Sequence, residues 1–247
     1  MLADPAAQRR LLDVAALDVK LVHLRHRAAN LPENEELKGL QAERVALAGR
    51  ITEAATRRGD AQAEFDRVDR DLEAARARQE RNRGRADSGE IADQRALQSL
   101  LAEIGHLDGR ISDLEDIELE AMQEIEDATG VHDELLARRA GIEDRMRALL
   151  ASRDRSKAEI TEQGGRLMSE RELAREPLPA ELLALYDKIA GRTGSSGAAE
   201  LRARRCGGCG MELDQAELHT IAASRPDAVA RCEECGRILV RTGESGL

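Results

Sequence analysis

The chain has 247 residues, a formal net charge of −10 and 1% aromatic residues, with one Phe, one Tyr and no Trp. So few bulky side chains exclude a large globular core, and 35% charged residues with abundant Ala and Leu are typical of long helices. The negative charge argues against general attraction to nucleic acid or anionic membranes. No apolar stretch approaches the length of a membrane span or of a signal sequence, so we expect a cytoplasmic protein.

Two apolar seams predict a long coiled-coil hairpin. Residues 40–75 and 97–149 carry apolar side chains at alternating steps of three and four, the heptad pattern of a coiled coil. The first seam continues toward the N-terminus, with a kink expected near residues 31–32 because proline disfavours helix at the residue before it. Two helices joined by a short turn lie antiparallel. The sequence therefore predicts an antiparallel hairpin over residues 1–178.

The turn of this hairpin is expected near residues 81–90. Gly84 can end the first helix in a left-handed cap, and Asp87 with Glu90 can form a capping box for the second. A register in which the numbers of opposed residues add up to 172 matches the two seams, with Phe65 opposite Leu107. Sums shifted by seven also match, but 172 is centred on residue 86, inside the expected turn.

The remaining chain changes in composition. Residues 179–197 comprise a short amphipathic helix over 180–190 and a flexible Gly- and Ser-rich joint over 191–197. Residues 198–247 form a small module in which Asp214 and Glu217 cap a short helix and residues 237–242 form a strand. We therefore expect a mostly α protein: a long antiparallel hairpin followed by a small C-terminal module of short strands and a short helix.

The four cysteines stand in two identically spaced pairs within this module: Cys206, Cys209, Cys232 and Cys235. Two residues between thiolates let one tight turn present both sulfurs to one ion, and the glycine after each pair can take positive φ. The pattern predicts a zinc ribbon with one structural Zn²⁺; iron or redox-active thiols are the alternatives. Four thiolates close a tetrahedral coordination sphere, so no position remains for an activated water or a substrate.

The segment LEDIELEAMQEIE (residues 114–126), followed by the CGGCG and CEECG knuckles, resembles the bacterial C4-type zinc-ribbon, coiled-coil hairpin family. The resemblance spans nearly the whole chain and implies that the four cysteines hold the metal. Better-known members are non-enzymatic adaptors. A flagellar member chaperones an alternative sigma factor and binds a flagellin transcript, and a chlamydial member is linked to a sigma factor and to secretion components. A sigma factor or a secretion or assembly component is the partner that this resemblance implies.

Two groups of arginines are candidate surfaces for a partner or for nucleic acid. The first surrounds the cysteines and comprises Arg202, Arg204, Arg205, Arg231, Arg237 and Arg241. The second lies at the expected hairpin tip and comprises Arg76, Arg78, Arg81, Arg83 and Arg85. Either group can grip phosphates or dock a partner if its members converge, and either can be ordinary solvated arginine. The module has no aromatic side chain on which bases could stack.

These observations favour a zinc-binding adaptor or chaperone that docks protein partners through its rod and ribbon, in transcription or related regulation. The alternative is a nucleic-acid-binding regulator, of RNA or DNA, that uses the ribbon arginines. An enzyme is not expected, because the sequence has no phosphate loop and no nucleophile with a partnered base. Neither a membrane nor a small-molecule substrate is expected as a partner.

Overall fold

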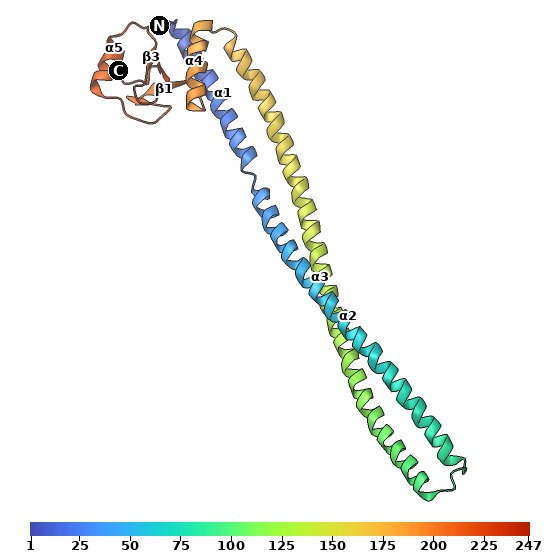
Figure 1. Cartoon of the computed structure of the whole chain (residues 1–247). Coiled ribbons are helices and arrows are strands. Elements are labelled where there is room, and N and C mark those ends of the chain that lie inside the picture. Colours follow the sequence, from blue (N-terminus) through green and yellow to red (C-terminus); the bar gives the residue numbers. More distant parts are fainter. The chain divides into compact units, whose positions relative to one another are not determined.

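The computed structural model describes residues 1–247 and confirms a mostly α chain, with a long helical hairpin followed by a small region of strands and one helix (Figure 1). The helices are α1 (Pro5–Ala29), α2 (Pro32–Asp87), α3 (Gln94–Arg175), α4 (Ala180–Thr193) and α5 (Gln215–Ala223). The strands are β1 (Ala198–Arg202), β2 (Arg205–Cys206), β3 (Ala230–Arg231) and β4 (Ile238–Arg241). None of the helices combines the length and the apolar character that crossing a membrane requires.

The chain divides into two compact units. Residues 36–149 form the hairpin unit; residues 1–35 and 150–247 form the ribbon unit, which includes α1, α4 and the cysteine module. This division differs from the boundaries expected at 178 and 198, because the N-terminal helix is grouped with the module rather than with the tip of the hairpin. The break between α1 and α2 at residues 30–31 lies beside the expected kink.

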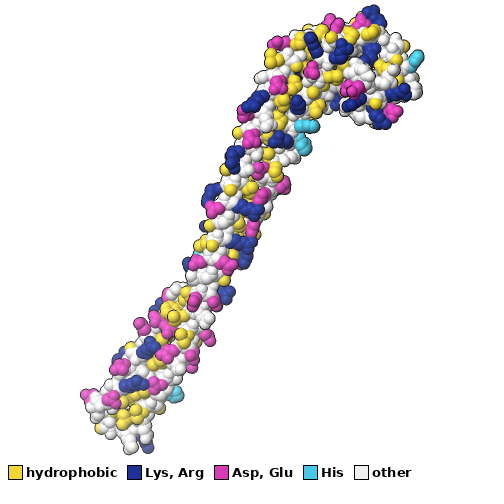
Figure 2. Space-filling view, turned by 180° about the vertical axis from the view of Figure 1, so that it is seen from behind, with side chains coloured by type: hydrophobic (Ala, Val, Ile, Leu, Met, Phe, Trp, Pro, Cys, Tyr) yellow, Lys and Arg dark blue, Asp and Glu magenta, His cyan; other side chains and the backbone are white.

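In the hairpin unit, α2 and α3 pack through the predicted apolar seams. The buried side chains form two clusters, Leu40, Leu47 and Ala54 with Leu135 and Ile142, and Val68 and Leu72 with Leu114. Acidic and basic side chains alternate along the exposed surface, with hydrophobic side chains between them (Figure 2). The helices are therefore held by a narrow apolar seam with charged flanks, as the heptad pattern predicts.

Ion pairs along one flank fix the register of the hairpin. They join Glu36 to Arg145, Glu43 to Arg138, Arg57 to Glu124 and Arg78 to Glu103. The residue numbers of each pair add up to 181, and those of the pairs on the opposite flank, Arg76–Glu115 and Arg83–Asp108, add up to 191. The seam between the flanks therefore has a sum of about 186, as for Leu72 and Leu114 in one buried cluster. This is two heptads from 172, so the expected register is wrong. An apolar seam that repeats every seven residues permits several registers, and here the position of the turn selects one of them.

The turn lies later than predicted, over residues 88–93. Gly84 stays within α2, and Gly89 takes the left-handed conformation with φ +67°. Asp93 caps α3, with Oδ1 accepting from the Arg95 N–H at 3.2 Å and Oδ2 from the Ala96 N–H at 3.3 Å. The predicted cap at Gly84 and the capping box of Asp87 with Glu90 are therefore wrong. The last turns of α2 stay helical because side chains such as Arg83 pair across to α3, in this case with Asp108 at 2.9 Å.

In the ribbon unit, a four-stranded sheet in the order β2-β1-β4-β3 is covered on both faces. β1 runs parallel to β4, and the two outer pairs are antiparallel. Successive β4 side chains point to opposite faces: Ile238 and Val240 join a core with α1 and α4, whereas Leu239 joins a core with α5 and the cysteines. The sheet is therefore a shared layer between the metal centre and the two helices.

The core between the sheet and the helices, called the shared core below, contains large side chains that are fully buried. They are Leu11, Val14, Leu182, Tyr186, Ile238 and Val240. Leu24 and Leu31 of the first arm instead pack with Ile160 of α3. Leu173 of α3 is 65% exposed.

The segment expected as a flexible joint is packed. Gly194 ends α4 with φ +66°, and Thr193 Oγ1 donates to the Ser196 carbonyl at 3.1 Å. A Cβ at Gly197 would lie 2.2 Å from the Tyr186 carbonyl oxygen, so only glycine fits there. The connection from α4 to β1 is therefore held by hydrogen bonds and close packing.

The N-terminus is also tied to the cysteine module. The Ala3 N–H donates to the Asp227 carbonyl at 2.8 Å, and the Val229 N–H donates to the Met1 carbonyl at 3.2 Å. The buried Gln8 amide donates to the Ala3 carbonyl at 2.8 Å. Three residues before α1 therefore extend the strand pairing of the ribbon.

A polar network at the edge of the shared core joins α1, α3 and α4. The Tyr186 hydroxyl donates to Asp18 Oδ2 at 2.6 Å, and Arg171 donates to Asp18 Oδ1 at 2.5 Å. Arg175 donates two hydrogen bonds to Asp187, both at 2.8 Å, and this contact lowers the pKa of the Asp187 carboxyl. Burial raises the pKa of Tyr186, and the Asp18 carboxylate raises it further, so the phenol remains a neutral donor.

We expect Tyr186→Phe to lower the free energy of unfolding of the ribbon unit by about 1.5–3 kcal/mol, because it removes a hydrogen bond to a charged acceptor. Chemical denaturation of zinc-loaded protein measures this loss. An unchanged midpoint would mean that Arg171 alone satisfies Asp18.

We expect Leu47→Ala, in the hairpin seam, to cost about 2–5 kcal/mol because Leu47 is 3% exposed and its removal leaves a cavity. Val45→Ala is the matched control: Val45 is 62% exposed on the same helix, so its change should stay within about 0.5 kcal/mol. Urea denaturation followed by circular dichroism compares them, and equal effects would contradict the seam.

Candidate metal centre

Two knuckles of the same design carry the four cysteines. In the first, residues 206–210, the Gly210 N–H donates to the Cys206 carbonyl at 2.8 Å; in the second, residues 232–236, Gly236 donates to Cys232 at 2.8 Å. Both glycines have positive φ, +76° and +69°. Glycine adopts this conformation without steric cost, as expected from the sequence. It lets each turn place both of its sulfurs on the same side.

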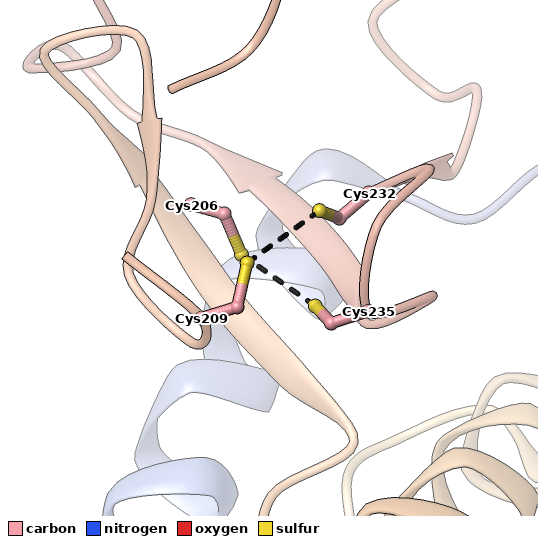
Figure 3. Close-up of side chains that lie close together, drawn as sticks. All are labelled: Cys206, Cys209, Cys232 and Cys235. Atoms are coloured by element: carbon pink, nitrogen blue, oxygen red, sulfur yellow. Dashed lines mark hydrogen bonds between the residues drawn. The ribbon is translucent and has the colours of Figure 1, made fainter. Parts of the chain in front are cut away.

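The knuckles direct their sulfurs toward one point (Figure 3). All four Sγ atoms lie within 4.8 Å of one another. Cys206 Sγ lies 3.8 Å from Cys235 Sγ, and Cys209 Sγ lies 3.9 Å from Cys232 Sγ. A tetrahedral ion with metal–sulfur distances of about 2.3 Å separates its sulfurs by about 3.8 Å, so the arrangement fits zinc.

The surroundings of the sulfurs favour a structural role. Burial raises the pKa of Cys206, and it raises that of Cys232 to about 12. Burial acts in the same direction on Cys235, but hydrogen bonds from Arg237 and the neighbouring thiols outweigh it and lower the pKa to about 7. Two of the metal-free thiols are therefore poor nucleophiles, and a metal that binds all four must displace protons.

Residues 14–194 match the family described as the CT398-like coiled coil hairpin domain, and residues 205–239 match the C4-type zinc ribbon domain. The chain belongs to the CT398-like coiled-coil hairpin family. The first match covers α2, α3, α4 and most of α1, and the second covers the four cysteines.

Similar proteins cover nearly the full chain. The uncharacterized protein Rv2229c of Mycobacterium tuberculosis is 34% identical over 98% of both chains. A solved structure from Mycobacterium smegmatis is 28% identical, with a TM-score of 0.83 over 98% of this chain and 100% of that one. The structure of CT398 from Chlamydia trachomatis is 17% identical, with a TM-score of 0.65 over 96% of this chain and 98% of that one, and shows the shared fold.

The cysteine geometry and the match to a C4-type ribbon confirm the prediction of one structural zinc ion. Bound zinc supplies the cross-link that a module of this size needs, since about 50 residues bury too little apolar surface to fold unaided. With four sulfur ligands the ion has no open position for a reacting group.

The six ribbon arginines each have a partner within the chain. Arg202 pairs with Glu244 at 2.8 Å, and Arg205 pairs with Glu212 at 2.7 Å. The other four donate to backbone carbonyls: Arg204 to Gly246, Arg231 to Gly236, Arg237 to Ser196, and Arg241 to five carbonyls between Ile221 and Ala228. Their guanidinium groups stabilise the turns of the module.

Most tip arginines also have partners across the hairpin. Arg76 pairs with Glu115, Arg78 with Glu103 and Arg83 with Asp108. Arg85 adds to the positive field that lowers the pKa of Glu103, after the larger effect of the hydrogen bond from Arg78. Arg81 is exposed. The tip charges therefore serve in part to fix the register of α2 against α3.

One contact of the site was missed in the sequence. Arg192 of α4 donates to the Cys235 carbonyl at 2.9 Å, so a helix outside the module supports the second knuckle. This contact has no sequence signal, because it depends on how the knuckle packs on α4. The Gly208 N–H donates to Cys206 Sγ at 3.4 Å, a contact that the tight turn of the C-x2-C spacing allows.

We expect chelation of zinc to increase amide hydrogen exchange in residues 198–247 and also in residues 1–17, because the shared core joins the sheet to α1. Residues 36–149 should keep their protection. Hydrogen–deuterium exchange with mass spectrometry resolves the three segments. Loss of protection in the hairpin unit as well would show that the metal supports the whole chain.

Proposed function

We propose that this protein is a non-enzymatic zinc-binding adaptor or chaperone that docks protein partners through its helical hairpin and ribbon. The observation that carries the proposal is the closed sulfur site, with four sulfurs within 4.8 Å of one another. Such a site stabilises a surface and leaves the metal no coordination position for a substrate. The family resemblance supports transcription or a related assembly process in the cytoplasm as the setting.

The contacts of the arginines favour protein over nucleic acid as the partner. A surface that binds phosphates presents several cations toward one path along the backbone. Here ribbon arginines such as Arg205 and Arg241 are engaged within the chain. The large exposed side chains of α3, among them Leu119 at 63% and Met122 at 51%, offer apolar contact area instead.

A pull-down of tagged protein from its own cell lysate, with and without RNase, tests the proposal. We expect one or more proteins that co-purify at stoichiometric levels and resist RNase. Cys232→Ser is the ribbon variant and should lose partners that need the zinc-bound module. Val45→Ala, an exposed change, controls for the effect of substitution itself.

RNA enriched over the control, with all proteins lost on RNase treatment, would favour a nucleic-acid-binding regulator over the adaptor. Absence of any specific protein or RNA from the purified material would contradict both proposals.

A further inference from the structure

Two cavities follow one stripe of α1 within the ribbon unit. The first, about 610 Å³, lies between α1 and the first knuckle; the second, about 400 Å³, lies between α1 and α3. Lys20 and His23 line both cavities, so the two adjoin at these residues and together form a groove along α1. It follows α1 from Leu12 to Arg27, about 22 Å of helix at about 1.5 Å per residue. We call it the α1 groove.

The floor of the α1 groove is apolar. Leu12, Ala16 and Val19 line its first half, and Leu24 and Leu167 line its second. Val19 is 36% exposed, although its neighbours Leu17 and Leu21 point into the protein and are less than 10% exposed. Val19 and its apolar neighbours along this length can contact another helix.

Glycine shapes the wall that the first knuckle contributes. A Cβ at Gly208 would lie 2.5 Å from Arg237 Cδ and 3.0 Å from Ala199 Cβ. The bare backbone lets the Arg237 side chain cross the knuckle and reach the Ser196 carbonyl at 3.1 Å. Arg237 thereby lies at the wall of the groove.

The rim of the α1 groove is basic, although the chain carries a net charge of −10. The basic residues that line it are Lys20, Arg27, Arg166 and Arg237, and the acidic ones are Glu170 and Glu200. Glu200 accepts the Thr242 hydroxyl at 2.9 Å and keeps its negative charge, and Arg166 pairs with Glu162 of its own helix. Histidine and basic side chains lie beside hydrophobic ones on the face that Figure 2 shows.

α1 itself carries more basic than acidic residues. Its basic residues are Arg9, Arg10, Lys20, Arg25 and Arg27, and its acidic residues are Asp13 and Asp18. The Asp18 carboxylate accepts hydrogen bonds from Tyr186 and Arg171. The groove therefore combines an apolar floor with more basic than acidic side chains along its rim, Lys20 and Arg27 among them.

We propose that the α1 groove binds an acidic amphipathic helix of a protein partner. A helix of about four turns matches the length of the groove, its apolar face would cover the floor, and its carboxylates would meet the rim. Nucleic acid fits less well, because bases need aromatic platforms: Tyr186 is fully buried and Phe65 belongs to the hairpin unit. The proposal rests on the adaptor function and names its docking site.

A phage-displayed library of random helix-forming 16-residue peptides, selected on the full-length zinc-loaded protein, tests the proposal. We expect the enriched peptides to carry several Asp or Glu residues on one helical face and Leu, Ile, Phe or Met on the other. Fluorescence anisotropy of the best peptide should show at least tenfold weaker binding to Lys20→Glu/Arg27→Glu, and a similar loss for Val19→Gln.

Lys157→Glu/Lys188→Glu is the matched control, since it makes the same charge change at exposed residues that do not line the groove. Its affinity should stay within about twofold of wild type. Failure to enrich peptides, enrichment without acidic residues, or equal losses in both double variants would overturn the proposal. So would displacement of the peptide by a single-stranded 20-nucleotide RNA at physiological salt.

The same variants separate this proposal from the adaptor function. If Lys20→Glu/Arg27→Glu still retains every RNase-resistant partner in the lysate pull-down, the α1 groove is not the docking site and the adaptor function stands. If wild type retains no partner at all, the adaptor function fails whatever the peptides show.

Discussion

The shared core is the constraint on which the ribbon unit depends. Ile238 and Val240 of β4 are fully buried against Leu11 of α1 and against Leu182 and Tyr186 of α4. Each such side chain contributes about 1.5–3 kcal/mol when it is removed from water. A C-terminal module of 50 residues cannot supply this much apolar surface by itself. It therefore depends on the apolar side chains of α1 and α4.

Zinc and the helices act on opposite faces of one sheet. On one face Leu239 packs with Leu218, Ile221 and the buried sulfurs of Cys206 and Cys232. On the other face the same strand completes the shared core. The metal fixes the positions of the knuckles. Arg192 of α4 donates to the Cys235 carbonyl, and this hydrogen bond joins the second knuckle to α4. The walls of the α1 groove follow from this arrangement, because the first knuckle and α1 are parts of one packed unit.

Short-range patterns in the sequence predicted much of this structure. Cysteine spacing predicted the knuckles, and the seam predicted two long helices with a break beside Pro32. Asp214 caps α5 as expected, its carboxylate accepting from the Glu217 N–H at 2.7 Å. Each of these features depends on residues within a few turns of one another, or on a chemistry with few solutions.

Features that depend on distant contacts could not be predicted in the same way. The register was wrong because a seven-residue repeat is compatible with several alignments, and the turn that selects among them lies later than the sequence predicted. β1, with the sequence Ala-Ala-Glu-Leu-Arg, has the composition of a helix and becomes a strand only by pairing with β4. The strand pairing of Met1–Ala3 with the ribbon has no local signal, since its partners lie more than 200 residues away.

The central claim is that the ribbon is stabilised by helices outside it, and the zinc affinity of Leu182→Ala tests it most directly. Leu182 belongs to α4, is fully buried and contacts no cysteine in its core cluster. Competition with a chelator should show at least about tenfold weaker zinc binding for this variant, since burying leucine contributes about 2–5 kcal/mol to a folded core. Leu173→Ala, at a residue that is 65% exposed, should bind zinc as wild type does. Equal zinc affinity in Leu182→Ala and wild type would contradict the claim and make the ribbon an independent module.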